Sequence, residues 1–245
     1  MSSRGNLAAT PEPDGDDHWV SISDMMAGLM VIFLFIAISY MVVVKADKAR
    51  IEKIAVIYQE LQQGLYADLE REFAEDLERW KAVLSRETLA IRFMEPEVLF
   101  GQGAAEIRPM FGDILDEFFP RYLTILRQPV YIDDISEIRI EGHTNSDWSA
   151  TVSEDDAYIL NMELSQDRTR SVLDYVMGIP SVGQDTQVRE WLTHYLTANG
   201  LSSSKLVLNA DGAENKVASR RVEFRVRMDA ESRIVEILHR RERDE

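Results

Sequence analysis

The sequence lacks cysteine altogether, and it is poor in basic residues. Without cysteine, a disulfide framework, a zinc–thiolate site and a thiol nucleophile are excluded. Only 27 Lys and Arg stand against 43 Asp and Glu, which gives a net charge of −16. This charge opposes binding to phosphate backbones, and no basic stripe with interleaved aromatic residues occurs, so we expect no nucleic-acid partner. Glycine-rich phosphate loops, Ser-His-Asp sets and histidines at metal-ligand spacing are also missing, so we expect no catalytic site, metal or cofactor.

One long apolar run is present, at residues 19–44, and Asp24 is its only charged side chain. About 20 uncharged residues follow Asp24, and at about 1.5 Å per residue they span about 30 Å, the thickness of a bilayer's hydrocarbon core. The flank before the run is acidic and no cleavage site follows it, unlike a signal peptide. We therefore predict a retained transmembrane helix at 18–44. Residues 1–17 carry Gly, Pro, Ser and Asp without periodicity and are predicted to be a disordered tail.

Residues 45–86 have a helical composition without proline. Their apolar positions are spaced three and four residues apart at first, as in a heptad repeat, and later mostly four apart. A two-stranded helical stalk that continues the membrane helix is the favoured interpretation. The alternative is an amphipathic helix that packs on its own domain.

A compact α+β domain is predicted at 87–228, followed by a charged helical tail at 229–245. Alternating apolar residues and turn signals indicate strands, and longer periodic segments between glycine or proline stops indicate helices. The expected strands are 88–93, 137–141, 205–209 and 222–228, and the expected helices are 110–126, 158–177 and 184–199. This order predicts a mixed sheet with helices on one face.

Four separated motifs in this domain resemble the OmpA-like peptidoglycan-binding family. They are VLFGQGAAEIRP at 98–109, IRIEGHTN at 138–145, NMELSQDRTRSV at 161–172 and SRRVEF at 219–224. The resemblance covers about 130 residues and implies the OmpA-like fold and binding to the cell wall. Two family positions differ, because Asn145 stands where the family has Asp and Ser219 where it has Asn.

The N-terminal segment is similar to the B subunits of bacterial ion-driven stators, which combine a Trp, an Asp and a Met-rich membrane helix with an OmpA-like domain. Here these residues are Trp19, Asp24, Met25 and Met26. The acidic tail and continuous helical linker look more like the ZorB subunits of Zorya anti-phage defence than flagellar MotB. The alternatives are a flagellar MotB-type subunit and a passive OmpA-like envelope tether without ion flow.

The stator resemblance implies partners and a location. It implies a homodimer that works with a multi-pass membrane A subunit present in excess, and that carries protons or sodium ions while anchored to peptidoglycan. It also implies a single-pass inner-membrane protein with a cytoplasmic N-terminus and a periplasmic C-terminal domain. The positive-inside rule points the other way, because the basic residues near the helix lie mostly after it. These are Lys45, Lys48, Arg50 and Lys53, against Arg4 before the helix.

The resemblance further implies a ligand pocket. Its residues here are Asn145, Asn161, Leu164, Arg168 and Arg221. An arginine fork suits a carboxylate of a peptidoglycan stem, and an oxygen at position 145 suits its ammonium.

Each of these assignments has an alternative. Asp147 or an acid of 154–156 could supply the carboxylate that Asn145 lacks. Arg168 could be a surface residue paired along its helix, and Asn161 could be a helix N-cap. Arg221 could be structural.

For Asp24 two roles are open. Hydrocarbon disfavours a charged carboxylate, so a carboxyl group there takes up a proton at neutral pH and releases it when its surroundings change. That is the chemistry of an ion carrier, the role that the stator resemblance implies. Alternatively, Asp24 caps the N-terminus of the membrane helix from the interface.

Overall fold

The computed structural model describes residues 16–94, 96–149 and 151–229. The chain divides into two units, Met1–Lys53 and Ile54–Glu245, and helix α1 (Asp16–Arg79) contributes to both. The tails predicted at 1–17 and 229–245 lie almost entirely outside the described residues.

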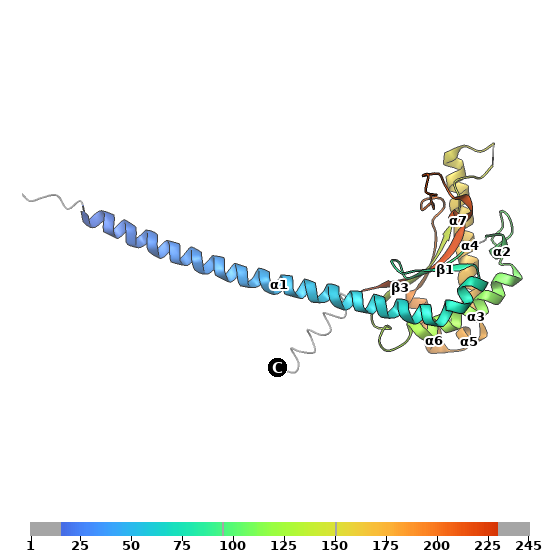
Figure 1. The fold of residues 1–245 in the computed structure, drawn as a ribbon, viewed down its shortest axis with the longest axis horizontal. Coiled ribbons are helices and arrows are strands. Elements are labelled where there is room, and N and C mark those ends of the chain that lie inside the picture. The colour runs from blue at the N-terminus through green and yellow to red at the C-terminus, as the bar shows by residue number, and fades with distance from the viewer. Residues whose placement is uncertain (1–15, 95, 150, 230–245) are drawn as a thin grey trace, which may run out of the picture. The chain divides into compact units, whose positions relative to one another are not determined.

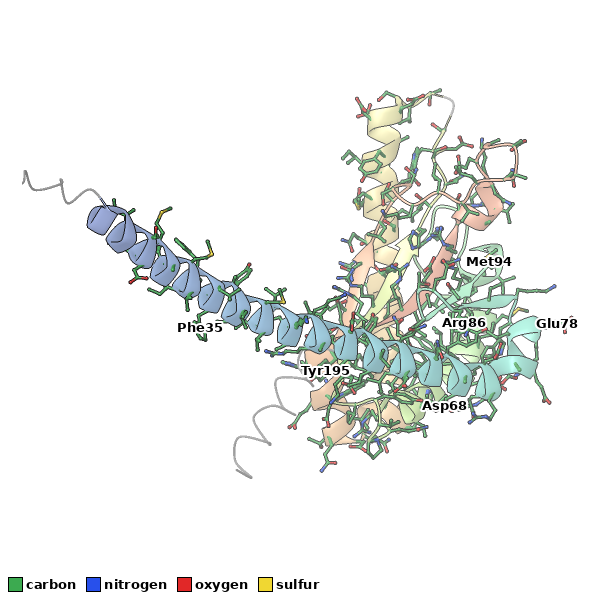
Figure 2. All side chains as sticks on the ribbon, turned by 60° about the vertical axis from the view of Figure 1, so that its left-hand side comes forward. Phe35, Asp68, Glu78, Arg86, Met94 and Tyr195 are labelled. Carbon is green, nitrogen blue, oxygen red and sulfur yellow. The ribbon has the colours of Figure 1, made fainter. Side chains whose placement is uncertain are left out.

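In the first unit, α1 is apolar on all sides. The side chains of residues 22–44 are exposed around the helix, with Met25 at 75% and Phe35 at 67%. Figure 2 shows Phe35 on this part of the helix. A helix that is apolar all round is buried in a protein core or in a membrane. Within the described residues, this is the one helix long and apolar enough to cross a bilayer.

The second unit contains the remaining elements, labelled where there is room in Figure 1. The strands are β1 (Ala82–Ser85), β2 (Ala90–Phe93), β3 (Ile135–His143), β4 (Leu196–Gly200) and β5 (Arg221–Met228). The helices are α2 (Pro96–Leu99), α3 (Pro109–Leu126), α4 (Glu154–Gly178), α5 (Pro180–Gly183), α6 (Thr186–Tyr195) and α7 (Lys216–Ser219).

The strands form one mixed sheet in the order β1-β2-β5-β3-β4. Strands β3 and β4 are parallel, and the other pairs are antiparallel. Because strand side chains alternate, each row across the sheet belongs to one face. Ile91, Phe224 and Ile140 are aligned in one row and are 0% exposed. The neighbouring row, on the opposite face, is charged and includes Arg92, Glu223 and Glu141.

The helices cover the apolar face of the sheet. Phe118 of α3 packs on Phe224 with ring centroids 5.1 Å apart, and Phe73 of α1 packs on Phe118 at 5.4 Å. On α4, Thr169 lies against Gly142 of β3. The expected fold, an apolar N-terminal helix followed by a mixed sheet with helices on one face, is confirmed.

The C-terminal part of α1 belongs to this core. Leu65, Leu69 and Phe73 are 0% exposed, and Tyr58 and Leu61 pack against the same cluster. Polar contacts add to the packing, since the Tyr131 hydroxyl donates to Asp68 at 2.8 Å (Asp68 is labelled in Figure 2). Arg121 of α3 also bonds Glu72 and Asp76 of α1. From about Tyr58 onward, the apolar stripe therefore contacts the chain's own domain, as in the alternative to the stalk.

Three secondary-structure predictions were wrong. Helix α1 ends at Arg79, and residues 82–85 of the predicted stalk form β1 instead. The helix predicted at 184–199 stops at Tyr195, and residues 196–200 form β4 beside β3. The segment 205–209 is a turn-rich loop with an isolated bridge from Leu208 to Glu214, not a strand. In the second case pairing with β3, more than 50 residues earlier, decides the structure, and propensity does not reveal such a partner.

Candidate functional site

A cavity of about 620 Å³ opens between the loop after α2, the loop after β3, and α4. It is lined by Phe100, Gly101, Gln102, Gly103, Arg108, Thr144, Asn145, Asp147, Trp148, Asn161, Leu164, Arg168 and Arg220. The structure thus brings together four of the five predicted ligand-binding residues, all except Arg221. The motif at 98–109 forms one wall, so the signal for that wall was present in the sequence.

Helix α4 presents three cavity residues from one face. Asn161, Leu164 and Arg168 are spaced three and four residues apart, which aligns them along a helix. The helix is capped at its start by Ser153, whose hydroxyl accepts from the Asp156 N–H at 3.2 Å. Asn161 lies well inside the helix, so the alternative that it is an N-cap was wrong. Its amide instead donates to the carbonyl oxygen of Asp147 at 3.1 Å and supports the facing loop.

Arg168 is 9% exposed, so the alternative of a surface ion pair was wrong. Its Nε donates to the Ala104 carbonyl at 2.9 Å and its Nη2 to the Gly101 carbonyl at 3.3 Å. The guanidinium also lies 5.0 Å from the centre of the Phe100 ring. Burial, with the charge of Arg220, lowers the pKa of Arg168 to about 10, so the group remains charged at neutral pH. Neutral carbonyl groups in the wall of the cavity therefore hold the charged guanidinium of Arg168 in place.

Two polar pairs tie the rim of the cavity together. Ser146 donates its backbone N–H to Glu214 at 3.1 Å and its hydroxyl to the same carboxylate at 2.5 Å. Lys216 donates a hydrogen bond to the Asp147 carboxylate in an ion pair, and this hydrogen bond raises the pKa of Lys216. The loop after β3 is thereby joined to the segment around α7, more than 60 residues away in sequence. Neither pair was foreseen from the sequence.

The two arginines of the last motif have different positions. Arg220 lines the cavity, with its Nε on the Lys216 carbonyl at 3.2 Å. Arg221 does not line it: its Nε donates to Glu223 at 2.6 Å, and its Nη1 donates to the carbonyls of Lys205 and Ser219. The end of α7 separates the two side chains: Arg220 is the C-cap of this helix, whereas Arg221 is the first residue of β5 and lies on the same face of the strand as Glu223.

A buried charged cluster lies on the face of the sheet that Arg221 joins. Glu141, His143 and Glu223 have potential ligand atoms within 4.8 Å of one another. Burial raises the pKa of Glu223, but the hydrogen bond and charge of Arg221, with nearby His143 and Arg92, outweigh it, so the net pKa is lowered. The Glu223 carboxylate contacts Arg221 and also Arg92, at 3.0 Å. Arg92 and Arg221 therefore already neutralise the Glu223 carboxylate, which a metal ion would need as a ligand.

Asp24 lies within α1 and is exposed. The helix begins at Asp16, about two turns earlier, so Asp24 does not cap its N-terminus and the capping alternative was wrong. The carboxylate is followed directly by the uncharged run of residues 25–44. The structure thus places a single acidic side chain at the start of an apolar helical surface.

No known family model matches the chain. The chain is 46% identical over 229 residues to Zorya protein ZorB of Escherichia coli (strain ATCC 8739), covering 93% of this chain and 95% of that protein. Because the match covers 93% of this chain, it includes residues of both the apolar helix and the domain.

Among solved structures, a MotB-like protein from Desulfovibrio vulgaris is similar, with 26% identity and a TM-score of 0.48, over 69% of this chain and 93% of that one. The cell wall anchor of the T6SS from Pseudomonas aeruginosa has 22% identity and a TM-score of 0.43, over 66% and 97%. The periplasmic domain of Helicobacter pylori MotB has 17% identity and a TM-score of 0.41, over 62% and 85%.

Proposed function

This chain belongs to the ZorB family, and from that premise we propose that it is the B subunit of an ion-driven stator in a bacterial inner membrane. The observation that carries the proposal is that one chain combines two features. The first is an apolar helical segment, residues 19–44, whose one carboxylate is Asp24, and the second is a domain with an arginine-lined cavity. The first part is suited to ion transfer and the second to anchoring. The output would be Zorya anti-phage defence.

The cavity is the proposed peptidoglycan site. Arg168 supplies a charged guanidinium with donors left over for a stem-peptide carboxylate, and such charge-assisted pairs are among the stronger hydrogen bonds in proteins. Asn161 supports the facing loop, while Leu164 and Asn145 line the ligand space. Arg220 takes the place of Arg221 in the proposed set, because Arg221 is committed to Glu223.

Asp24 is the proposed ion carrier. One helix does not enclose an ion path, so the path requires a multi-pass A subunit, and two copies of this chain would work inside several copies of it. Each charge that crosses the membrane gains about 2.3 kcal/mol per 100 mV. Proton or sodium binding at Asp24 would then change its contacts with the partner and drive movement.

The proposed peptidoglycan site implies which way the chain crosses the inner membrane. Peptidoglycan lies outside the inner membrane, so the domain would be periplasmic and the N-terminus cytoplasmic, against the count of basic residues around the helix. Protease accessibility in spheroplasts tests this: an accessible domain agrees with the proposal, and a protected one contradicts it.

The ion-carrying role is tested with Asp24→Asn, using Asp47→Asn as the matched control after the apolar run. With the A subunit in reconstituted vesicles, Asp24→Asn should abolish ion flux and Asp47→Asn should leave it near wild type. If Asp24→Asn assembles and still conducts, the chain is better described as a passive tether.

Anchoring is tested by co-sedimentation with purified sacculi. Arg168→Ala should weaken binding by about 10- to 100-fold, the range for losing a hydrogen bond to a charged group. Arg170→Ala is the control, because Arg170 lies on the same helix with its side chain 78% exposed. Equal binding of both variants would reject the site.

A further inference from the structure

The cavity contains more positive charge than the zwitterionic end of a stem peptide requires. Three arginines line it, Arg108, Arg168 and Arg220, against a single aspartate, Asp147. Within the described part of the chain, none of the three guanidinium groups forms an ion pair with a carboxylate; Arg168 and Arg220 are held by backbone carbonyls. The cavity is thus prepared for anionic groups at several positions.

The one carboxylate of the cavity is already neutralised. Asp147 forms an ion pair with Lys216, and the adjacent Ser146 is bonded twice to Glu214, so the loop is held in this position. The ion pair brings no net negative charge to the cavity, so Asp147 attracts an incoming ammonium group less than a free carboxylate would. The acids of 154–156, the other candidates for this role, do not line the cavity.

The remaining candidate for binding an ammonium is Asn145. It lines the cavity directly after the buried Thr144, at the position where a carboxylate is expected from the motif. An amide oxygen accepts a hydrogen bond but brings no charge, so it lacks the attraction between opposite unit charges that a carboxylate offers an ammonium. The same amide donates N–H bonds, which a carboxylate cannot. Asn145 can therefore pair with a neutral amide group through both its oxygen and its N–H groups, and it does not need an ammonium.

We propose that this cavity recognises its ligand through carboxylates alone and does not require a free ammonium. The ligand class is a peptide-linked dicarboxylic amino acid whose side-chain amine is acylated, as in a cross-link between stems. Arg168 and Arg220 bind the carboxylate, and Asn145 faces the amide. This inference rests on the proposed wall-binding function and names the form of the wall that the site selects.

The test uses the full-length protein in detergent, retained on sacculi and displaced by two free ligands. They are meso-diaminopimelate and pimelate, which share a carbon chain and both carboxylates but differ in the amines. Wild type should be released by pimelate at a concentration no higher than that of diaminopimelate. Asn145→Asp restores a carboxylate and should make diaminopimelate about tenfold more effective than pimelate, the ratio for about 1.4 kcal/mol of charge-assisted bonding. Gln187→Glu, an exposed change outside the cavity, adds the same charge and should behave like wild type.

The outcomes separate the inference from the function beneath it. Release of wild type by diaminopimelate but not by pimelate would overturn the inference and leave wall binding intact. Release by neither ligand would also overturn it, because the cavity would then not bind free carboxylates. Failure to bind sacculi at all would overturn the proposed wall-binding function together with this inference.

Discussion

Leu69 offers a direct test of whether the C-terminal part of α1 belongs to the domain or to a stalk. Its side chain is 0% exposed within a single chain and lies in the same core cluster as Leu65 and Phe73. Leu69→Ala should therefore destabilise the domain without any contribution from a second chain. In a two-stranded stalk the same substitution would instead weaken association.

The expected magnitude follows from the burial. Replacing leucine with alanine removes about three carbon groups, or about 2.4 kcal/mol at about 0.8 kcal/mol per buried CH₂. Neighbouring side chains relax only partly into the space left behind, so a cavity term raises the loss to about 3–4 kcal/mol. That is a substantial part of the total stability of about 5–15 kcal/mol for an ordinary domain.

The assay is urea unfolding of residues 54–245, followed by tryptophan fluorescence. Trp148 and Trp191 also contribute to the signal, and the most buried of the three tryptophans is Trp80. This residue is buried beside Phe73, with ring centroids 5.8 Å apart, so it reports on the same cluster. For a urea dependence of about 2 kcal/mol/M, the midpoint should fall by about 1.5–2 M. The control is Val56→Ala on the same helix, where the side chain is 53% exposed and the change should stay within about 0.5 kcal/mol. If Leu69→Ala shifts the midpoint no further than Val56→Ala, the packing of α1 on the domain is refuted and the stalk interpretation stands.

Three further predictions concern the domain. A Cβ at Gly200 would lie 2.3 Å from the Gln166 backbone nitrogen, so Gly200→Ala should cost about 1–3 kcal/mol in thermal unfolding by separating β4 from α4. Gly178→Ala is the control because nothing lies within 4 Å, and equal losses would contradict the argument. Burial lowers the pKa of His143 from the ordinary value of 6.5, so the unfolded chain binds this proton first. The contribution of His143 to the free energy of unfolding should be fully present above about pH 6.5 and should decrease as the pH falls from there to the lowered pKa. A His143→Gln variant with the same pH profile as wild type would show that the decrease has another origin. Asp185 caps α6 through two backbone N–H groups, so Asp185→Ala should cost about 1 kcal/mol by chemical denaturation, with Asp185→Asn recovering most of it; no recovery would argue against capping.

Local patterns in the sequence were enough for much of the fold. The apolar run of residues 25–44 predicts its own helix, since hydropathy and length are properties of a contiguous segment. The alternation in 137–141 and 222–228 predicted the central strands β3 and β5, because a half-buried strand shows its period directly. The cavity residues of α4, Asn161, Leu164 and Arg168, were instead implied by the resemblance to the OmpA-like family, and helical spacing alone did not single them out.

Other features depended on contacts between residues far apart in the chain. Strand β4 exists through its pairing with β3, more than 50 residues earlier, and its Ala-Asn-Gly ending has little strand propensity of its own. The burial of Leu69 and Phe73 depends on α3, and the ion pair of Asp147 depends on Lys216. Of two adjacent arginines, only Arg220 lines the cavity, because it caps the end of α7, whereas Arg221 begins β5 and bonds Glu223 on one face of that strand.

The sequence by itself therefore determined the apolar helix with its Asp24, the mixed α+β class and most of the cavity residues, because each of these has a local or motif-length signal. Only the tertiary structure decided which part of the chain packs against the helix after the apolar run, which arginine lines the cavity and which carboxylate is already neutralised. Those outcomes are set by distances between segments that the order of residues along the chain does not encode locally.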